Sequence, residues 1–201
     1  MNPKDFNLKI CLPAKSFTDI LVISPGISGG QDNILIQTLR EIALKENIAI
    51  VTWDFTFFIL GKEIDKNNDI QELETVINHV KEQYPTTRIH LAGKSYGGLI
   101  SSLVDPTLSE SLCVFGLLKD FEGIQFKKPK NKPLFVIHGT EDRFFTIDII
   151  KNYFKNEENL LVVKGGTHGL SDKDGNFIGE DAIMWYIKKL NLFINKNLNK
   201  T

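Results

Sequence analysis

The sequence predicts an α/β fold in which a mostly parallel sheet carries helices on both faces, within a single domain over residues 1–201. Three observations support this prediction. Short apolar runs recur along the chain, amphipathic helical patterns lie between them, and 201 residues suit one core of ordinary size. Strands that alternate with helices imply right-handed crossovers and therefore parallel pairing.

The predicted strands are continuous apolar runs rich in β-branched residues, without polar residues in alternation. Strands that are buried on both faces of a parallel sheet show this pattern. In chain order the runs are LVIS at 21–24, IAIVT at 48–52, IHLA at 89–92, LCVFG at 112–116, LFVIH at 134–138 and LLVVK at 160–164. A weaker strand is expected near residues 7–12.

Helices are predicted where apolar residues recur three and four positions apart. The stretch 33–46 has such a stripe and stops near Asn47, and the stretch 70–84 stops before Pro85. Further helices are expected over residues 96–104, 147–154 and 181–198. We interpret the apolar stripes of these helices as the faces that pack on the sheet.

Composition and charge narrow the classes of function. The chain is 42% hydrophobic and 24% charged, and its formal net charge is -1. A nearly neutral chain lacks the positive surface that nucleic acid or an anionic membrane attracts. The basic stretch FKKPKNKP at 126–133 is short and isolated, so we interpret it as a solvated loop and expect no nucleic-acid partner.

Targeting signals and cofactor motifs are not apparent in the sequence. No apolar run approaches the ~20 residues of a membrane span, and the first ten residues, MNPKDFNLKI, lack the apolar core of a signal peptide. We therefore expect a cytoplasmic protein with no membrane span. Cys11 and Cys113 lie in apolar segments outside any CxxC pattern, which predicts buried free thiols and no metal site.

The stretch Gly93-Lys94-Ser95-Tyr96-Gly97 is a G-x-S-x-G pattern between a predicted strand and a predicted helix. In that context the pattern is typical of a nucleophile elbow, where a strained turn raises the serine Oγ above the sheet. The Tyr96 N–H would begin the helix, where free amides and the helix dipole favour a developing oxyanion. The alternative interpretation is an ordinary glycine-rich connection. Neither interpretation gives Lys94 a role.

A serine nucleophile needs a base, and the base needs an acid that orients it. After Ser95, one predicted strand runs into the acidic pair Glu141 and Asp142, and a later strand runs into the loop that contains His168. Both loops follow the carboxyl ends of strands, which is the edge where open α/β sheets build their sites. The order serine, acid, histidine is also that of nucleophile-elbow hydrolases.

With these segments the chain resembles the α/β-hydrolase superfamily. The matching motifs are GKSYGG at 93–98, HGTED at 138–142 and GGTHGL at 165–170, and their order and spacing cover nearly the whole chain. The resemblance is closest to small members with little or no cap, similar to dienelactone hydrolases, carboxylesterases and acyl-protein thioesterases. It implies three catalytic residues and no cofactor: Ser95 as nucleophile, His168 as base and then acid, and Asp142, at the aspartate of an HGxxD pattern, as orienting acid.

His79 lies in a helical pattern and His90 in a strand before the nucleophile, so we interpret both as structural; His138 is interpreted likewise, because His168 is the better match for the base. Glu141 is interpreted as a solvated neighbour of Asp142, with the role of the acid as its alternative. A second oxyanion donor is expected in the loop SPGISGG at 24–30, where superfamily members often carry His-Gly. In this chain Pro25-Gly26-Ile27 stands there, so we expect the backbone N–H of Ile27 to donate, with Ser28 as the alternative. The loop lacks the spacing of phosphate-binding glycine motifs.

Two aromatic clusters follow predicted strands at the same edge. The hypothesis is that they line a pocket for an apolar acyl group; helix-to-sheet packing is the alternative. The residues concerned are Trp53, Phe55 and Phe57 in the first cluster and Phe144 and Phe145 in the second. Arg143, directly before the second cluster, is interpreted either as a partner of a substrate carboxylate or as a surface charge.

These features predict a serine hydrolase that cleaves a small ester or thioester, or an acylated substrate, through an acyl-enzyme. Ser95 and Asp142 are too close in the sequence for a helical lid between them. Two other classes stay open. One is a binding or scaffold protein that has the fold but little activity, and the other is an acyltransferase or peptidase with the same three residues.

Overall fold

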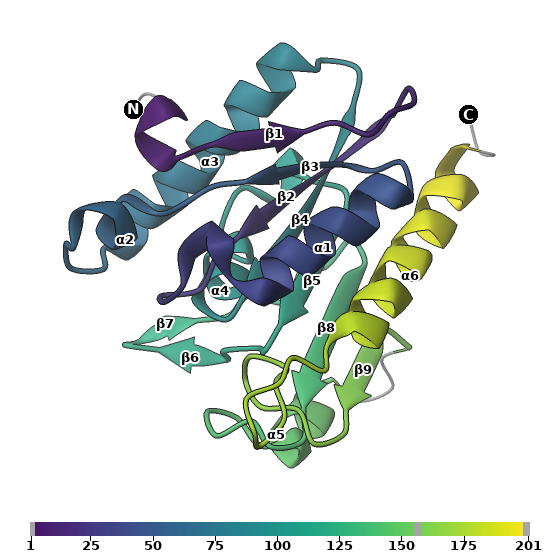
Figure 1. Cartoon of the computed structure of the whole chain (residues 1–201). Helices are drawn as coiled ribbons and strands as arrows, with labels where there is room; N and C mark the ends of the chain where they lie inside the picture. Colours follow the sequence, from purple (N-terminus) through teal and green to yellow (C-terminus); the bar gives the residue numbers. More distant parts are fainter. Residues whose placement is uncertain (1–2, 155–157, 199–201) are drawn as a thin grey trace.

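The computed structural model describes residues 3–154 and 158–198, and a seven-stranded sheet forms the centre of that part (Figure 1). The spatial order of the strands is β1-β3-β2-β4-β5-β8-β9. Their bounds are β1 (Lys9–Cys11), β2 (Asp19–Ser24), β3 (Ala49–Thr52), β4 (Arg88–Lys94), β5 (Leu112–Phe115), β8 (Leu134–Gly139) and β9 (Leu160–Val163). β1 pairs antiparallel with β3, and the other neighbouring strands pair in parallel.

Helices cover both faces of this sheet. α1 (Ile34–Lys45) and α6 (Glu180–Leu198) lie on one face, and α3 (Lys66–Gln83) and α4 (Tyr96–Ser101) lie on the other (Figure 1). The shorter elements are η1 (Pro3–Phe6), η2 (Gly30–Asp32), α2 (Thr56–Leu60), η3 (Pro106–Leu108), the hairpin of β6 (Asp120–Phe121) and β7 (Ile124–Gln125), and α5 (Ile147–Tyr153).

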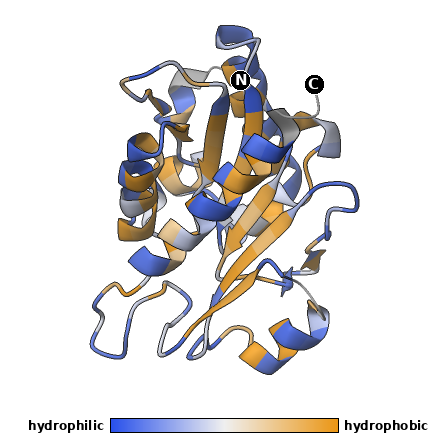
Figure 2. Cartoon of the chain, turned by 90° about the vertical axis from the view of Figure 1, so that its right-hand side faces the viewer, coloured by the Kyte–Doolittle hydropathy of each residue, from blue (hydrophilic) through white to orange (hydrophobic). Residues whose placement is uncertain are grey.

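The sheet separates two hydrophobic cores, and successive residues of a strand contribute to opposite ones. On β2, Ile20 and Val22 face the core under α3 and α4, whereas Leu21 and Ile23 face the core under α1 and α6. Both faces of a strand therefore favour apolar side chains, and the strands are apolar along most of their length (Figure 2). Continuous apolar runs in the sequence are the direct result.

The predicted fold class is confirmed, and the elements differ from prediction mainly at their ends. α3 begins at Lys66 rather than at 70, because the Asp65 side chain accepts hydrogen bonds from the Asn67 and Asn68 amides and starts the helix with polar residues. The helix α2 and the hairpin β6–β7 were not predicted, since both are too short to show a periodic pattern.

Among residues 3–154 and 158–198, no helical lid covers the edge at which the parallel strands end. In the described part of the chain, the segment between β5 and β8 holds the β6–β7 hairpin and no helix. Among the same residues, no helix is both long enough and apolar enough to cross a membrane.

Candidate active site

Ser95 lies on the turn between β4 and α4 in a backbone conformation that is unusual for a residue with a side chain, with φ 53° and ψ −118°. The residues two positions before and two positions after it must be glycines. A Cβ on Gly93 would lie 2.3 Å from the Gly98 nitrogen, and one on Gly97 would lie 2.3 Å from the Ser24 carbonyl oxygen. The strand and the helix therefore meet at van der Waals distance, and this contact holds Ser95 in its strained conformation.

The structure brings Ser95, His168 and Asp142 into one hydrogen-bonded chain. The Ser95 Oγ lies 2.7 Å from His168 Nε2, and His168 Nδ1 lies 2.7 Å from Asp142 Oδ2. Glu141 is exposed and its carboxylate accepts from the Thr140 hydroxyl instead. Of the two adjacent carboxylates, Asp142 is thus the one that contacts the imidazole.

The surroundings of Asp142 keep it ionised. Burial alone would raise its pKa, but hydrogen bonds from His168 and from the Phe144 amide, together with the neighbouring imidazoles, hold the pKa below its ordinary value. An ionised Asp142 accepts a hydrogen bond from His168 Nδ1–H, which leaves Nε2 free to accept the Ser95 proton. His138, fully buried, donates from Nε2 to the Phe145 carbonyl oxygen and also lies 3.4 Å from Asp142.

The loop that carries His168 crosses the ends of two strands to reach Ser95, because β9 is at the edge of the sheet and β4 is at its centre. At the end of β8, a Cβ on Gly139 would lie 2.0 Å from the Gly166 carbonyl oxygen. After β5, a Cβ on Gly116 would lie 2.6 Å from the His168 carbonyl oxygen and 3.1 Å from its ring. The role of these two glycines was not predicted, although each stands at the end of an apolar run.

The loop after β2 lies beside the nucleophile, as the oxyanion hypothesis requires. A Cβ on Gly26 would lie 3.5 Å from the Ser95 Cβ. A buried polar network holds the far end of this loop: Asp54 Oδ1 accepts from the Gln31 amide at 2.6 Å, and Asp54 Oδ2 accepts from the Gln31 side chain at 3.1 Å. Asp54 follows β3 closely, a position that could have indicated its role.

The first aromatic cluster belongs to the core, which corrects the acyl-pocket hypothesis for its members. Trp53 and Phe55 have no exposed surface, and Phe57 is 6% exposed. The rings of Phe55 and Phe57 each pack edge-on against the Tyr96 ring, at centroid distances of 5.8 Å. These side chains support the residue after the nucleophile from behind and offer almost no surface to a substrate.

The second cluster divides into two kinds of environment. Phe145 is half-buried and packs on the core, whereas Phe144 is 66% exposed and its ring centroid lies 4.6 Å from that of His168. Ile27, in the loop after β2, is also partly exposed. Exposed apolar surface therefore lies at the His168 side and in the loop after β2.

Below Tyr96 lies a buried carboxylate that was not predicted from the sequence. The Tyr96 hydroxyl donates to Asp69 Oδ2 at 2.6 Å, and Asp69 Oδ1 has no hydrogen-bond partner. Burial, together with smaller contributions from the nearby Glu72 and Asp65 carboxylates, raises the pKa of Asp69 to about 6 in spite of the Tyr96 hydrogen bond.

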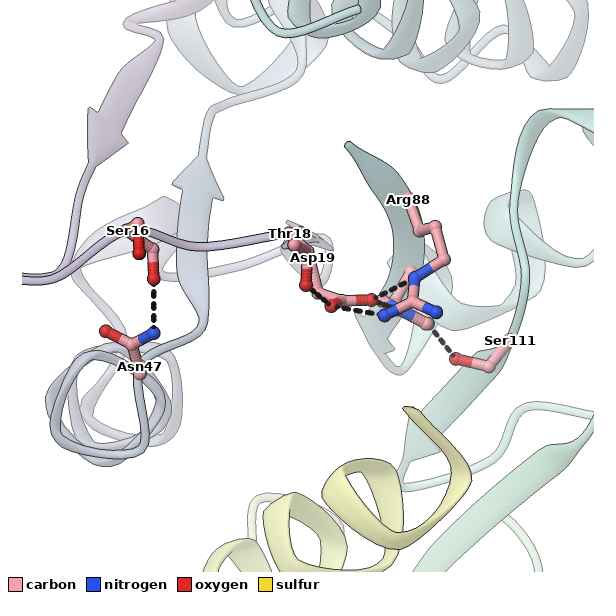
Figure 3. Close-up of polar contacts among 7 residues, drawn as sticks. Ser16, Thr18, Asp19, Asn47, Arg88 and Ser111 are labelled. Atoms are coloured by element: carbon pink, nitrogen blue, oxygen red, sulfur yellow. Dashed lines mark hydrogen bonds and ion pairs between the residues drawn. The ribbon is translucent and has the colours of Figure 1, made fainter. Parts of the chain in front are cut away.

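A second hydrogen-bonded Ser–His–Asp chain lies at the opposite, amino-terminal edge of the sheet (Figure 3). His90 Nδ1 lies 2.9 Å from the Ser111 Oγ, and His90 Nε2 lies 2.9 Å from Asp19 Oδ1. Asp19 also accepts two hydrogen bonds from the Arg88 guanidinium, at 2.8 Å each, and one from the Thr18 hydroxyl. Burial opposes ionisation of Asp19, but these hydrogen bonds lower its pKa to about 2.

This second chain is enclosed. His90 and Ser111 have no exposed surface, and Asp19 is 4% exposed. The prediction that His90 is structural agrees with this placement. In the described part of the chain, no group of three or more His, Cys, Asp and Glu side chains is arranged to hold a metal ion. Both cysteines are free thiols; Cys113 is buried as predicted, whereas Cys11 is only partly buried because β1 is at the edge of the sheet.

Comparison with known proteins shows which solved structures share this fold. No family model matches the sequence. Among solved structures, an α/β serine hydrolase homologue from Coxiella burnetii has a TM-score of 0.75 at 18% identity, covering 89% of this chain and 90% of its own. A serine hydrolase without a lid from Xanthomonas campestris has a TM-score of 0.72 at 18% identity, covering 91% of this chain and 88% of its own.

A third structure, Est1E from Butyrivibrio proteoclasticus with ferulic acid bound, has a TM-score of 0.71 at 16% identity, covering 93% of this chain and 94% of its own. Matches of this extent, together with the strand order, show the fold. The chain has the α/β-hydrolase fold in a small form, and the residues that the structure describes include no helical lid.

Proposed function

We propose that the protein is a serine hydrolase that cleaves a small ester or thioester through an acyl-enzyme. The observation that supports this proposal most is the chain of hydrogen bonds from Ser95 through His168 to Asp142 at the carboxyl edge of the sheet. The strained backbone of Ser95 adds to it, since a structural serine needs no such conformation.

The proposed reaction uses each residue in turn. The Ser95 Oγ attacks the acyl carbon while its proton moves to His168 Nε2, and Asp142 stabilises the imidazolium that forms. The backbone N–H groups of Tyr96 and Ile27 donate to the oxyanion. His168 then gives its proton to the leaving group, which departs as an alcohol or thiol, and water releases the acyl group by the same route.

The proposed substrate is small or exposed, because no helical lid encloses the site among the residues that the structure describes. Phe144 contacts the His168 ring, Ile27 follows the glycine that faces Ser95, and both side chains have exposed apolar surface. We propose that they hold the apolar part of the acyl group, a role in which Trp53, Phe55 and Phe57 cannot take part from the core. Phe145 is expected to contribute only by supporting the turn.

The test is hydrolysis of 4-nitrophenyl esters from acetate to octanoate, with a matched thioester series. The proposal predicts turnover of the short esters by the wild type and loss of at least about 10⁴-fold in kcat for Ser95→Ala. Phe144→Ala is expected to raise KM several-fold for the longer esters only. Folded wild-type protein that turns over no ester or thioester would overturn the proposal and favour a binding protein.

A further inference from the structure

Lys94, between Gly93 and the nucleophile, is a buried lysine without a polar partner among the described residues. The residue is 9% exposed, and within the described part of the chain it has no hydrogen bond or ion pair. The buried side-chain nitrogens and oxygens that lack partners belong to Trp53, Asp69, His138 and Tyr186. The Lys94 ammonium is not among these enclosed atoms, so it keeps some contact with solvent.

Lys132, a half-buried lysine of this chain, shows the ordinary situation, in which a lysine that loses water gains polar partners. Burial lowers the pKa of both Lys94 and Lys132. The Lys132 ammonium, however, donates to the Ser109 hydroxyl at 2.6 Å and has the carboxylates of Glu110 and Asp105 nearby. An ammonium that loses water without gaining partners lowers the stability of the folded protein. A functional role for Lys94 would explain why the chain has a lysine at this position.

The position of Lys94 indicates such a role. Its stem runs along the loop after β2, where its Cδ would lie 3.8 Å from a Cβ on Gly26, and the same glycine faces the Ser95 Cβ. Its side chain is on the face of the sheet that it shares with Phe115, its register partner on β5. The Lys94 stem thus lies beside the loop that we assign to the oxyanion, at the residue directly before the nucleophile.

We propose that Lys94 is a specificity-determining residue that pairs with a negatively charged group of the substrate, so that the preferred substrates are anionic esters or thioesters. This inference rests on the proposed function. A substrate anion would form an ion pair with the Lys94 ammonium, which has no such partner among the described residues. The attraction would be strong because the surroundings have a low dielectric constant. Arg143 is the rival cation near the site, but it is exposed and its charge is screened by water.

The experiment compares esters that differ only in charge. The first pair is the 4-nitrophenyl half-ester of glutaric acid and its neutral carboxamide counterpart, which place the group on the acyl side. The second pair is 3-carboxy-4-nitrophenyl acetate and its carboxamide counterpart, which place it on the leaving group. The ratio of kcat/KM within each pair is measured, after correction for spontaneous hydrolysis, for the wild type, Lys94→Met, Lys94→Arg and Arg143→Met.

The proposal predicts that the wild type prefers the anionic member of one pair by about tenfold or more. Lys94→Met should bring that ratio close to one, mainly through KM, while Lys94→Arg keeps part of it and Arg143→Met keeps most of it. Because it removes an unpartnered charge and retains the stem, Lys94→Met should also raise Tm by a few degrees.

Two results would overturn the inference while leaving the proposed function intact. One is a ratio of kcat/KM that Lys94→Met does not change. If kcat falls by the same factor for all four esters, the ratio is also unchanged, and the Lys94 charge would then act on the oxyanion rather than on a substrate anion. The other is a ratio that Arg143→Met removes. A wild type that hydrolyses the neutral 4-nitrophenyl esters but prefers neither anionic ester would also overturn the inference alone, whereas failure to hydrolyse any ester or thioester would overturn the proposed function, and the substrate class with it.

Discussion

Two Ser–His–Asp chains lie at opposite edges of one sheet, and they have the same connectivity with the imidazole reversed. In the chain of Ser95, the carboxylate contacts His168 Nδ1 and the hydroxyl contacts Nε2. In the chain of Ser111, the carboxylate contacts His90 Nε2 and the hydroxyl contacts Nδ1. The hydrogen bonds alone therefore do not distinguish a candidate active site from a structural network.

What differs is what surrounds each chain. The His168 side chain is 16% exposed and Ser95 occupies a strained turn, whereas the His90 side chain is 1% exposed and its residue lies within β4. Asp142 faces imidazoles and backbone amides, but Asp19 also holds the guanidinium of Arg88. A reactive Ser–His–Asp chain is therefore indicated by solvent access to its histidine, by a strained serine and by its position at the carboxyl edge of the sheet. A structural chain is indicated by a carboxylate whose oxygens already accept several hydrogen bonds from the protein.

The largest expected effect comes from neutralising each carboxylate in turn. Asp142→Asn should lower kcat by about 10⁴-fold with little change in stability, because the wrong imidazole tautomer is then held against Ser95. Asp19→Asn should leave kcat within about twofold but lower the free energy of unfolding by about 3 kcal/mol, since Arg88 and His90 lose their common partner. Ester kinetics and urea denaturation of both variants measure the two effects. The distinction fails if Asp19→Asn abolishes turnover in folded protein.

A smaller loss of activity is expected from substitution of Gly116, the glycine after β5 over which the His168 loop passes. Gly116 has φ 64°, and a Cβ there would press on the His168 carbonyl oxygen and ring. Gly116→Ala should displace the imidazole and lower kcat by about 10²-fold. The matched control is Gly61→Ala, because Gly61 has φ 62° and an added methyl group would meet no atom within 4 Å. Equal losses of activity in both variants would mean that backbone strain, and not the clash, is responsible.

The smallest effects concern the dependence of stability on pH. Asp19, at the amino-terminal edge of the sheet, and Asp69, below Tyr96, should change the free energy of unfolding in opposite directions as the pH rises. Asp19 has a pKa of about 2 against 3.8 in the unfolded chain, so its contribution, on the order of 2 kcal/mol, is present above pH 4 and lost as the pH falls toward 2. Asp69, under Tyr96, has a pKa of about 6, so the folded state holds a proton that the unfolded state releases. Stability should therefore fall by about 2 to 3 kcal/mol as the pH rises from 4 through 6.

Denaturation of the wild type, Asp19→Asn and Asp69→Asn between pH 2 and 7 separates these two contributions. Each variant should remove the pH dependence in its own window and leave the other window unchanged. A wild-type slope between pH 4 and 6 that persists in Asp69→Asn would show that another group carries that proton.

Sequence patterns sufficed for the features that depend on local chemistry. The apolar runs of the strands, the glycines around Ser95 and the loops with Asp142 and His168 follow from strand burial and from the order of the motifs. The enclosed chain could not be predicted, because Asp19 and His90 are 71 residues apart and meet only through strand register. The run from Trp53 to Phe57 was ambiguous for the same reason, since its burial depends on the ring of Tyr96.

The most direct test of the account is to identify the serine that a fluorophosphonate probe modifies in the wild type, Ser95→Ala and Ser111→Ala. The account predicts, by mass spectrometry of proteolytic peptides, one phosphonylated residue, Ser95, in the wild type and in Ser111→Ala, and no labelling of Ser95→Ala. Labelling of Ser111, or a folded wild type that takes no label at all, would contradict it.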